Sequence, residues 1–256
     1  MFREARLLAV RAKVAALETG GVAGRAVLPF GDARVDRRLP AGGLPLGRWH
    51  EAVGEGLEME TGAAAAAFVA SLAAPLAARG AVVWVMRRDD LYAPGLSTLG
   101  FPAERLIQVC VRDEAQALGA LEDALGSAGV AAAVGEVAGV DLTQGRRLQL
   151  ACERHGSAGF VIRRRPFGGQ ARAAASGAGS GSAAATRWRI DPAPSEPAPG
   201  VPGLGAPRWR VGLERCRGGR PGAWIMEKSD GAYPLRVVAE LGDRQLAAPQ
   251  SLRLAG

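Results

Sequence analysis

The segment from Gly54 to Gly62 has the spacing nearest to a phosphate-binding loop. Such a loop requires G-x-x-x-x-G-K-[ST], because its glycines let backbone N–H groups face the phosphates, its lysine neutralises them and its hydroxyl binds magnesium. When Gly54 is aligned with the first glycine, Met59 replaces the second, Glu60 replaces the lysine and Thr61 holds the hydroxyl position. The Glu60 carboxylate would then face a phosphate, and two negative charges ~4 Å apart repel each other by about 4 kcal/mol at an effective dielectric constant of 20.

The segment therefore predicts a degenerate site with no ATP hydrolysis and no bound cofactor. Weak residual ATP binding is the alternative. A plain strand-to-helix turn is the interpretation that the residues favour.

No other set of side chains has the spacing of a catalytic or metal site. His50 lies in a predicted strand and His155 at a predicted helix end, and neither an H-x-x-x-H nor a G-x-S-x-G motif occurs. Three cysteines, Cys110, Cys152 and Cys216, are far apart and odd in number, which fits neither a disulfide framework nor a zinc site. We expect no catalytic residue and no metal.

Arginines gather around one glycine-rich segment. Residues 146–220 contain 14 basic and four acidic residues, although the whole chain carries a net charge of only +7. Clustered arginines attract phosphate backbones, and a glycine-rich loop between them can follow a single strand. The candidates for contact with single-stranded DNA are Arg163, Arg164, Arg165, Arg172, Arg187 and Arg189. The alternative is that these arginines pair with acidic protein neighbours.

Strands alternate with helices over the middle of the chain, which predicts an α/β fold with a mostly parallel sheet and helices on both faces. Apolar runs predict strands at 48–53, 81–86, 105–109, 130–134 and 159–163. Helical patterns cover 62–78, 113–125 and 141–155. Further on, 186–190 reads as a strand, and 208–215 with 223–227 reads as a hairpin that extends the sheet in antiparallel fashion.

The rest of the chain is divided by composition. Residues 1–20 form a predicted helical arm, 21–230 the core and 231–256 a tail; within the core, 167–186 is a flexible loop and 191–207 a Pro-rich linker. An apolar stripe on the arm is too short to be stable alone, so we expect it to dock on a partner or a second copy, or on its own domain. The stripe comprises Leu7, Leu8, Val10, Val14 and Leu17.

The 256-residue chain is 48% apolar and long enough for a real core. Its longest uncharged run, 62–78, is mostly alanine and contains Pro75, so we expect no membrane span. Since no secretory signal is visible, we expect a soluble cytoplasmic protein.

The order of these segments resembles RecA-type recombinases. Leu39-Pro40-Ala41-Gly42-Gly43-Leu44-Pro45-Leu46-Gly47-Arg48 is similar to the stretch that leads into their first core strand, and the similarity continues over about residues 25–230. In RecA the second core strand leads into a catalytic glutamate, and the matching position in this chain falls near Arg88, with Asp89 and Asp90 adjacent. After Val134-Gly135, Glu136 is the one carboxylate that could serve magnesium. It also puts Arg163 where RecA has a glutamine that couples nucleotide to DNA, so that coupling is not expected here.

More narrowly, three segments are similar to the ImuA family, which is RecA-related and also described as SulA-like. They are Leu91-Tyr92-Ala93-Pro94-Gly95-Leu96, the run Asp141-Leu142-Thr143 with Arg146-Arg147-Leu148-Gln149-Leu150, and Arg215-Cys216-Arg217-Gly218-Gly219-Arg220-Pro221-Gly222. Membership implies an accessory role in bacterial SOS mutagenesis and translesion DNA synthesis. The implied partners are ImuB, an inactive polymerase homologue, and through it an error-prone replicative-type polymerase. The rival interpretations are an ATP-dependent DNA-binding ATPase and a SulA-like inhibitor of cell division.

Overall fold

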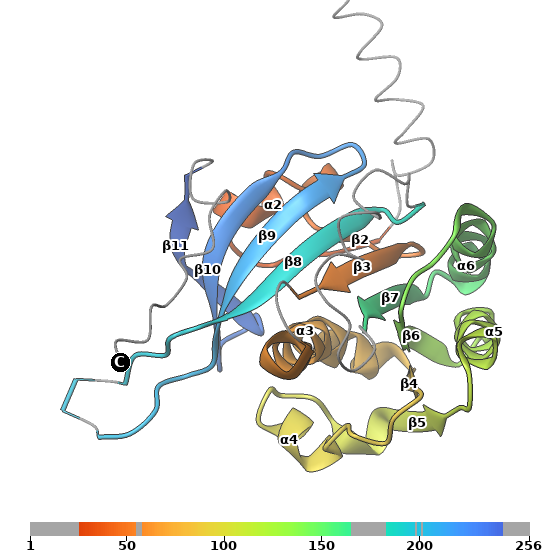
Figure 1. Cartoon of the computed structure of the whole chain (residues 1–256). Coiled ribbons are helices and arrows are strands. Elements are labelled where there is room, and N and C mark those ends of the chain that lie inside the picture. The colour runs from red at the N-terminus through yellow and green to blue at the C-terminus, as the bar shows by residue number, and fades with distance from the viewer. Residues whose placement is uncertain (1–25, 55–57, 165–182, 198, 201, 243–256) are drawn as a thin grey trace, which may run out of the picture.

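The computed structural model describes residues 26–54, 58–164, 183–197, 199–200 and 202–242, with only the backbone of 58–61. Within these ranges nine strands form one sheet in the order β11-β10-β9-β8-β3-β7-β6-β4-β5 (Figure 1). The strands are β3 (Trp49–Val53), β4 (Ala81–Met86), β5 (Leu106–Cys110), β6 (Val130–Val137), β7 (Ala158–Arg163), β8 (Thr186–Ala193), β9 (Arg208–Cys216), β10 (Gly222–Lys228) and β11 (Leu235–Leu241). A separate pair joins β1 (Val27–Leu28) to β2 (Leu44–Pro45).

The sheet is parallel from β8 to β5 and antiparallel from β9 to β11. Strand β3 lies between β7 and β8, both parallel to it, and β6, β4 and β5 continue in the same sense. Strands β9, β10 and β11 then alternate in direction. This arrangement confirms the predicted mostly parallel sheet with an antiparallel extension.

Helices cover both faces of the parallel part (Figure 1). One face packs against α3 (Glu58–Ala73), α4 (Ala93–Ser97) and α2 (Ala33–Asp36), and its core includes Phe68, Trp84 and Trp188. The opposite face packs against α5 (Glu114–Leu125) and α6 (Leu142–His155), around Trp49 and Leu121. The four tryptophans Trp49, Trp84, Trp188 and Trp224 are among the largest fully buried side chains.

The helix boundaries follow from local chemistry. Asp113 and Asp141 cap α5 and α6 by accepting hydrogen bonds from the backbone N–H groups of Gln116 and Gln144, each at 2.8 Å. At the other end of α3, Pro75 cannot supply an N–H group to the helix, and the chain tightens into the 3-10 segment η2 (Ala74–Arg79). The predicted helix over 62–78 is therefore an α-helix followed by a 3-10 turn.

Several short elements fall where no regular structure was predicted. Helix α4 and the 3-10 segment η1 (Pro40–Gly42) lie in segments for which no helix or strand was predicted, and the 3-10 segment η3 (Ala103–Arg105) overlaps the predicted strand 105–109 at Arg105. Strand β8 continues to Ala193, inside the segment read as a linker, because β9 pairs along its whole length. Strand β11 lies in the segment read as a tail and pairs with β10 from Ala223 to Lys228. The sheet therefore extends beyond residue 230.

The segment Gly62–Arg79 is long and apolar enough, by composition, to cross a membrane. In the structure it is α3 and η2, and 56% of it is buried against the sheet. Phe68, Val69 and Leu76 from this segment are part of the core. The segment has the position of a core helix.

Candidate functional site

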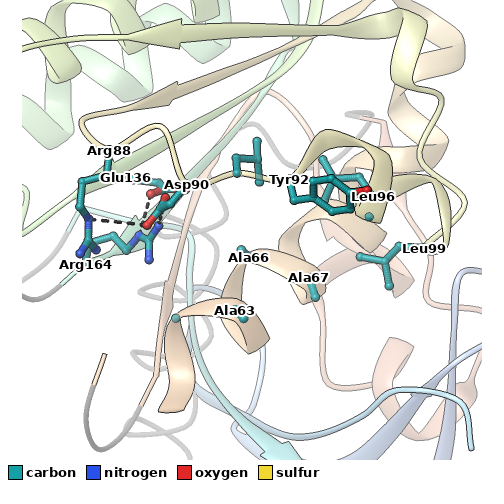
Figure 2. Close-up of a pocket in the computed structure, with 13 residues that line it drawn as sticks. Ala63, Ala66, Ala67, Arg88, Asp90, Tyr92, Leu96, Leu99, Glu136 and Arg164 are labelled. Atoms are coloured by element: carbon teal, nitrogen blue, oxygen red, sulfur yellow. Dashed lines mark hydrogen bonds and ion pairs between the residues drawn. The ribbon is translucent and has the colours of Figure 1, made fainter. Parts of the chain in front are cut away.

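A cavity of about 450 Å³ lies at the carboxyl ends of the parallel strands, where open α/β sheets bind their ligands. Figure 2 shows its walls, formed by α3, α4 and the chain segments that follow β4 and β7. The lining residues are Gly62, Ala63, Ala66, Ala67, Arg88, Asp90, Leu91, Tyr92, Gly95, Leu96, Leu99, Glu136 and Arg164. The cavity therefore has one apolar wall of small and aliphatic side chains and one end made of four charged groups.

The charged end is built around Glu136, whose residue is only 4% exposed. Its Oε1 accepts a hydrogen bond from Nε1 of the buried Trp84 at 2.8 Å, and its Oε2 accepts one from Nε of Arg164 at 2.6 Å. Arg164 also lies 2.7 Å from Oδ1 of Asp90 through Nη2, and Nε of Arg88 lies 3.7 Å from the other oxygen of Asp90. Both carboxylate oxygens of Glu136 are thus already occupied by donors.

These pairings limit what the charged end can bind. Two arginines and two carboxylates face one another, so the group carries no net charge. A triphosphate needs a surplus of positive charge, and magnesium needs carboxylate oxygens that are open to it. Within the described ranges, no group of three or more His, Cys, Asp or Glu side chains is placed to hold a metal ion. The cavity is better suited to an apolar group than to a magnesium nucleotide.

A strand and a helix flank the predicted phosphate-loop region. Strand β3 ends at Val53, Gly54 follows it, and α3 begins at Glu58. Met59, Glu60 and Thr61 belong to the first turn of α3, and their side chains lie outside the described residues, as do residues 55–57. The alignment of Glu60 with the lysine position stays a prediction from the sequence.

The arginines proposed for DNA contact are divided between the two faces of the sheet. Side chains alternate along a strand, so consecutive residues point to opposite faces. Arg163 pairs with Glu51, which lies on the α6 face with Trp49, whereas Arg164 pairs with Glu136 on the α3 face. The two neighbours therefore do not form one continuous basic patch.

Glu51 joins three parallel strands by ion pairs. It lies on β3, and its side chain is almost fully buried. Its Oε2 lies 2.8 Å from Nε of Arg187 on β8, and its Oε1 lies 3.5 Å from Nε of Arg163 on β7. Beyond it, Nε of Arg189 lies 3.7 Å from Glu214 on β9. Each of the four described candidate arginines thus has a carboxylate partner in its own chain.

The other predicted interaction residues lie outside the described part of the chain. These are Arg165 and Arg172 in the loop and Leu7, Leu8, Val10, Val14 and Leu17 in the N-terminal arm. Two residues that the sequence analysis did not select make central contacts here: Glu51 pairs with Arg163 and Arg187, and Trp84 donates a hydrogen bond to Glu136. A charged residue inside the apolar strand 49–53 was the available signal for a buried ion pair, because a buried carboxylate requires a partner.

His50 is a buried polar group that serves the fold. Its Nε2 donates to the carbonyl oxygen of Pro45 at 3.0 Å, which leaves Nδ1 to accept from the hydroxyl of Thr186 at 2.8 Å. The same Thr186 oxygen accepts from Nε1 of Trp188. Burial lowers the pKa of His50 to about 4, so the ring is neutral at pH 7.

The chain is similar in sequence to a curated protein over almost its whole length. The chain is 57% identical over 245 residues to the curated Protein ImuA of Caulobacter vibrioides strain NA1000 and equally to that of strain CB 15. In both cases the match covers 94% of this chain and 100% of the relative. No protein-family model matches the chain.

Proposed function

The chain belongs to the ImuA family, and we propose that it is a non-catalytic accessory protein of damage-induced translesion DNA synthesis. In this role it binds an ImuB-like inactive polymerase homologue in the cytoplasm and, through that partner, serves an error-prone replicative-type polymerase. Identity of 57% along 94% of the chain supports the family role. The partners follow from the resemblance of the sequence to this family.

The observation that supports a non-catalytic role is the pairing of Glu136. This residue is the last but one of β6, the strand that would supply a magnesium ligand, and Arg164 and Trp84 donate to its two carboxylate oxygens. For magnesium to bind there, a buried carboxylate would have to give up an ion pair and a hydrogen bond that already compensate its burial. Glu60, which aligns with the lysine position, also disfavours nucleotide binding, because its negative charge repels phosphate.

Nucleotide titration and turnover assays test this part of the proposal. The purified chain should show no ATP hydrolysis with magnesium, either alone or with single-stranded DNA. Turnover that Glu60→Ala abolishes would contradict the proposal and favour the rival ATPase function. Glu122→Gln is a matched control, because Glu122 forms an exposed ion pair with Arg147 away from the cavity.

Partner binding is tested with purified components. The full chain should bind the ImuB-like protein directly, as measured by biolayer interferometry, and should recover it in a pull-down from cells exposed to DNA damage. Recovery of the tubulin-like division protein in place of a polymerase homologue would favour the SulA-like alternative. Because nothing in partner binding requires nucleotide, the affinity should be equal with and without ATP.

Contact with single-stranded DNA is a further part of the proposal, through the arginines at the carboxyl end of β7, in the first half of β8 and in the segment between the two strands. The described members, Arg163, Arg164, Arg187 and Arg189, already face carboxylates. A phosphate must therefore compete with an internal partner at each of these positions. We accordingly expect weak binding without sequence preference, and we test it below by its salt dependence.

A further inference from the structure

The two edges of the sheet differ in charge. At one edge, β11 carries Arg236 and Glu240, which pair with Glu227 and Arg38. At the other edge, β5 has the sequence Leu106-Ile107-Gln108-Val109-Cys110, which contains no charged residue. Its inner side is hydrogen-bonded to β4. No strand pairs with the outer side of β5 in the part of the chain that the structure describes. Figure 1 shows this strand at the outer margin of the sheet, beyond β4.

An edge of this kind is a ready template for strand pairing. Its outward backbone N–H and C=O groups are unpaired, and soluble proteins usually protect such an edge with a charge, a proline or a bulge. Here Ile107 is 50% exposed, and Gln108 and Cys110 are also exposed. Strand β5, all of which the structure describes, contains no charged residue, no proline and no bulge.

The charges that flank β5 indicate what pairs with it. Glu104 and Arg105 precede the strand, and Arg112 and Asp113 follow it. In an antiparallel pair of two copies centred on Gln108, the segment before β5 of each copy, which carries Glu104 and Arg105, lies beside the segment after β5 of the other copy, which carries Arg112 and Asp113. Cross-strand pairs of opposite charge stabilise a sheet, and like charges destabilise it. A parallel pair in register would instead bring Glu104 beside Glu104.

We propose that β5 pairs with β5 of a second copy, antiparallel about a twofold axis at Gln108, so that the two sheets become continuous. Ile107 then lies opposite Val109 of the second copy, and Leu106 opposite Cys110. Such a contact is isologous, because the same patch is used by both copies, and it closes as a dimer. Glu104, Arg105 and Arg112 form no ion pair within the described ranges of their own chain, so they are available for this contact.

Sedimentation velocity on the full chain tests the proposal with matched variants at the two edges. The natural chain should be a dimer at micromolar concentration. Ile107→Lys places a charge in the centre of the contact and should give a monomer. Val238→Lys makes the same change at a residue of similar exposure, 41%, on the opposite edge strand β11, and should stay dimeric. Circular dichroism spectra establish that both variants are folded.

A charge swap tests the register and avoids any loss of folding, because both residues are exposed. Arg112→Glu should weaken the dimer roughly tenfold, since two symmetric ion pairs become repulsive. The double variant Glu104→Arg with Arg112→Glu should restore most of the affinity. Restoration by the double variant would be hard to explain by any other partner for these residues.

Crosslinking tests the centre of the pair. With Cys110→Ser as background, Gln108→Cys should form a disulfide-linked dimer under mild oxidation, and the background alone should not. In the natural chain the two Cys110 residues would lie about 14 Å apart along the strands, at ~3.4 Å per residue, and should not crosslink.

Three results would overturn the proposal. One is that the natural chain is a monomer. This includes a chain that dimerises only after residues 1–25 are removed, because that result would indicate that the N-terminal segment itself pairs with β5. Another is a dimer that Ile107→Lys leaves intact. The last is an efficient Cys110–Cys110 crosslink, which would indicate a parallel pair.

Discussion

Nε of Arg164 lies 2.6 Å from Oε2 of Glu136, and this ion pair joins the end of β7 to the end of β6 at the charged end of the cavity. The carboxylate is almost fully buried and the guanidinium is only 19% exposed. The pair places an arginine where a metal-dependent nucleotide site would need an open carboxylate. It is therefore a structural contact, and it is the observation that supports the proposed non-catalytic role.

The first prediction concerns this pair. Arg164→Met leaves Glu136 buried without its cation and should lower the free energy of unfolding by about 3 kcal/mol, the usual cost of breaking a buried ion pair. Urea denaturation measures the change. Adding Glu136→Gln should recover much of the loss, because no buried charge then remains. Arg147→Met removes an exposed pair with Glu122 and should cost no more than about 1 kcal/mol.

The second prediction concerns single-stranded DNA. If Arg163, Arg164 and Arg165 each neutralise one phosphate, the slope of log K against log[salt] contains about −0.7 per contact, or roughly −2 for the three. Replacing all three by alanine should remove that part of the slope in a fluorescence anisotropy titration, and replacing all three by lysine should keep it. An unchanged slope in the alanine variant would assign these arginines to protein contacts.

The structure adds a control to this experiment that the sequence did not suggest. A mobile loop would allow the alanine variant to fold normally, but Arg163 and Arg164 pair with the buried carboxylates of Glu51 and Glu136. These two residues therefore contribute to the stability of the folded domain. The stability of the variant must be measured beside its binding.

The third prediction concerns pH. The pKa of His50 in the folded chain is about 4, against 6.5 for an exposed histidine. Between these values the unfolded chain takes up a proton that the folded chain does not, so stability falls as the pH drops from about 6.5 to 4. The loss should reach about 3 kcal/mol, at 1.36 kcal/mol per pKa unit. His50→Gln should flatten this dependence in urea titrations, whereas His155→Gln, at an exposed position, should not.

The fourth prediction concerns the N-terminal arm. Deleting residues 1–20 removes the stripe of Leu7, Leu8, Val10, Val14 and Leu17 and should weaken binding of the ImuB-like partner or reduce the oligomeric mass. Light scattering and biolayer interferometry measure the two quantities. If both are unchanged, the stripe packs on its own domain. Comparison with Ile107→Lys separates an effect of the arm from an effect of the β5 edge.

Much of the parallel sheet was predictable because its signals are local. The buried run Ala81–Met86 is β4 with the predicted bounds, and the capping aspartates mark the starts of α5 and α6 within one residue. The glycine- and proline-containing turn at 218–222 predicted the β9–β10 hairpin. By contrast, α4 is a single short turn that contains Pro and Gly, and β11 has two charged residues among apolar ones, like many exposed segments. Their structure depends on the neighbours that they meet.

The sequence by itself determined the alternation of strands and helices and the family, because both are written in residue types at short spacing. Only the tertiary structure decided which charges meet. Glu51 meets Arg163 and Arg187 because β3 lies between β7 and β8, and Glu136 meets Arg164 because β6 and β7 end side by side. Strand order and register bring together residues more than 100 positions apart in the first case, and no local pattern contains that information.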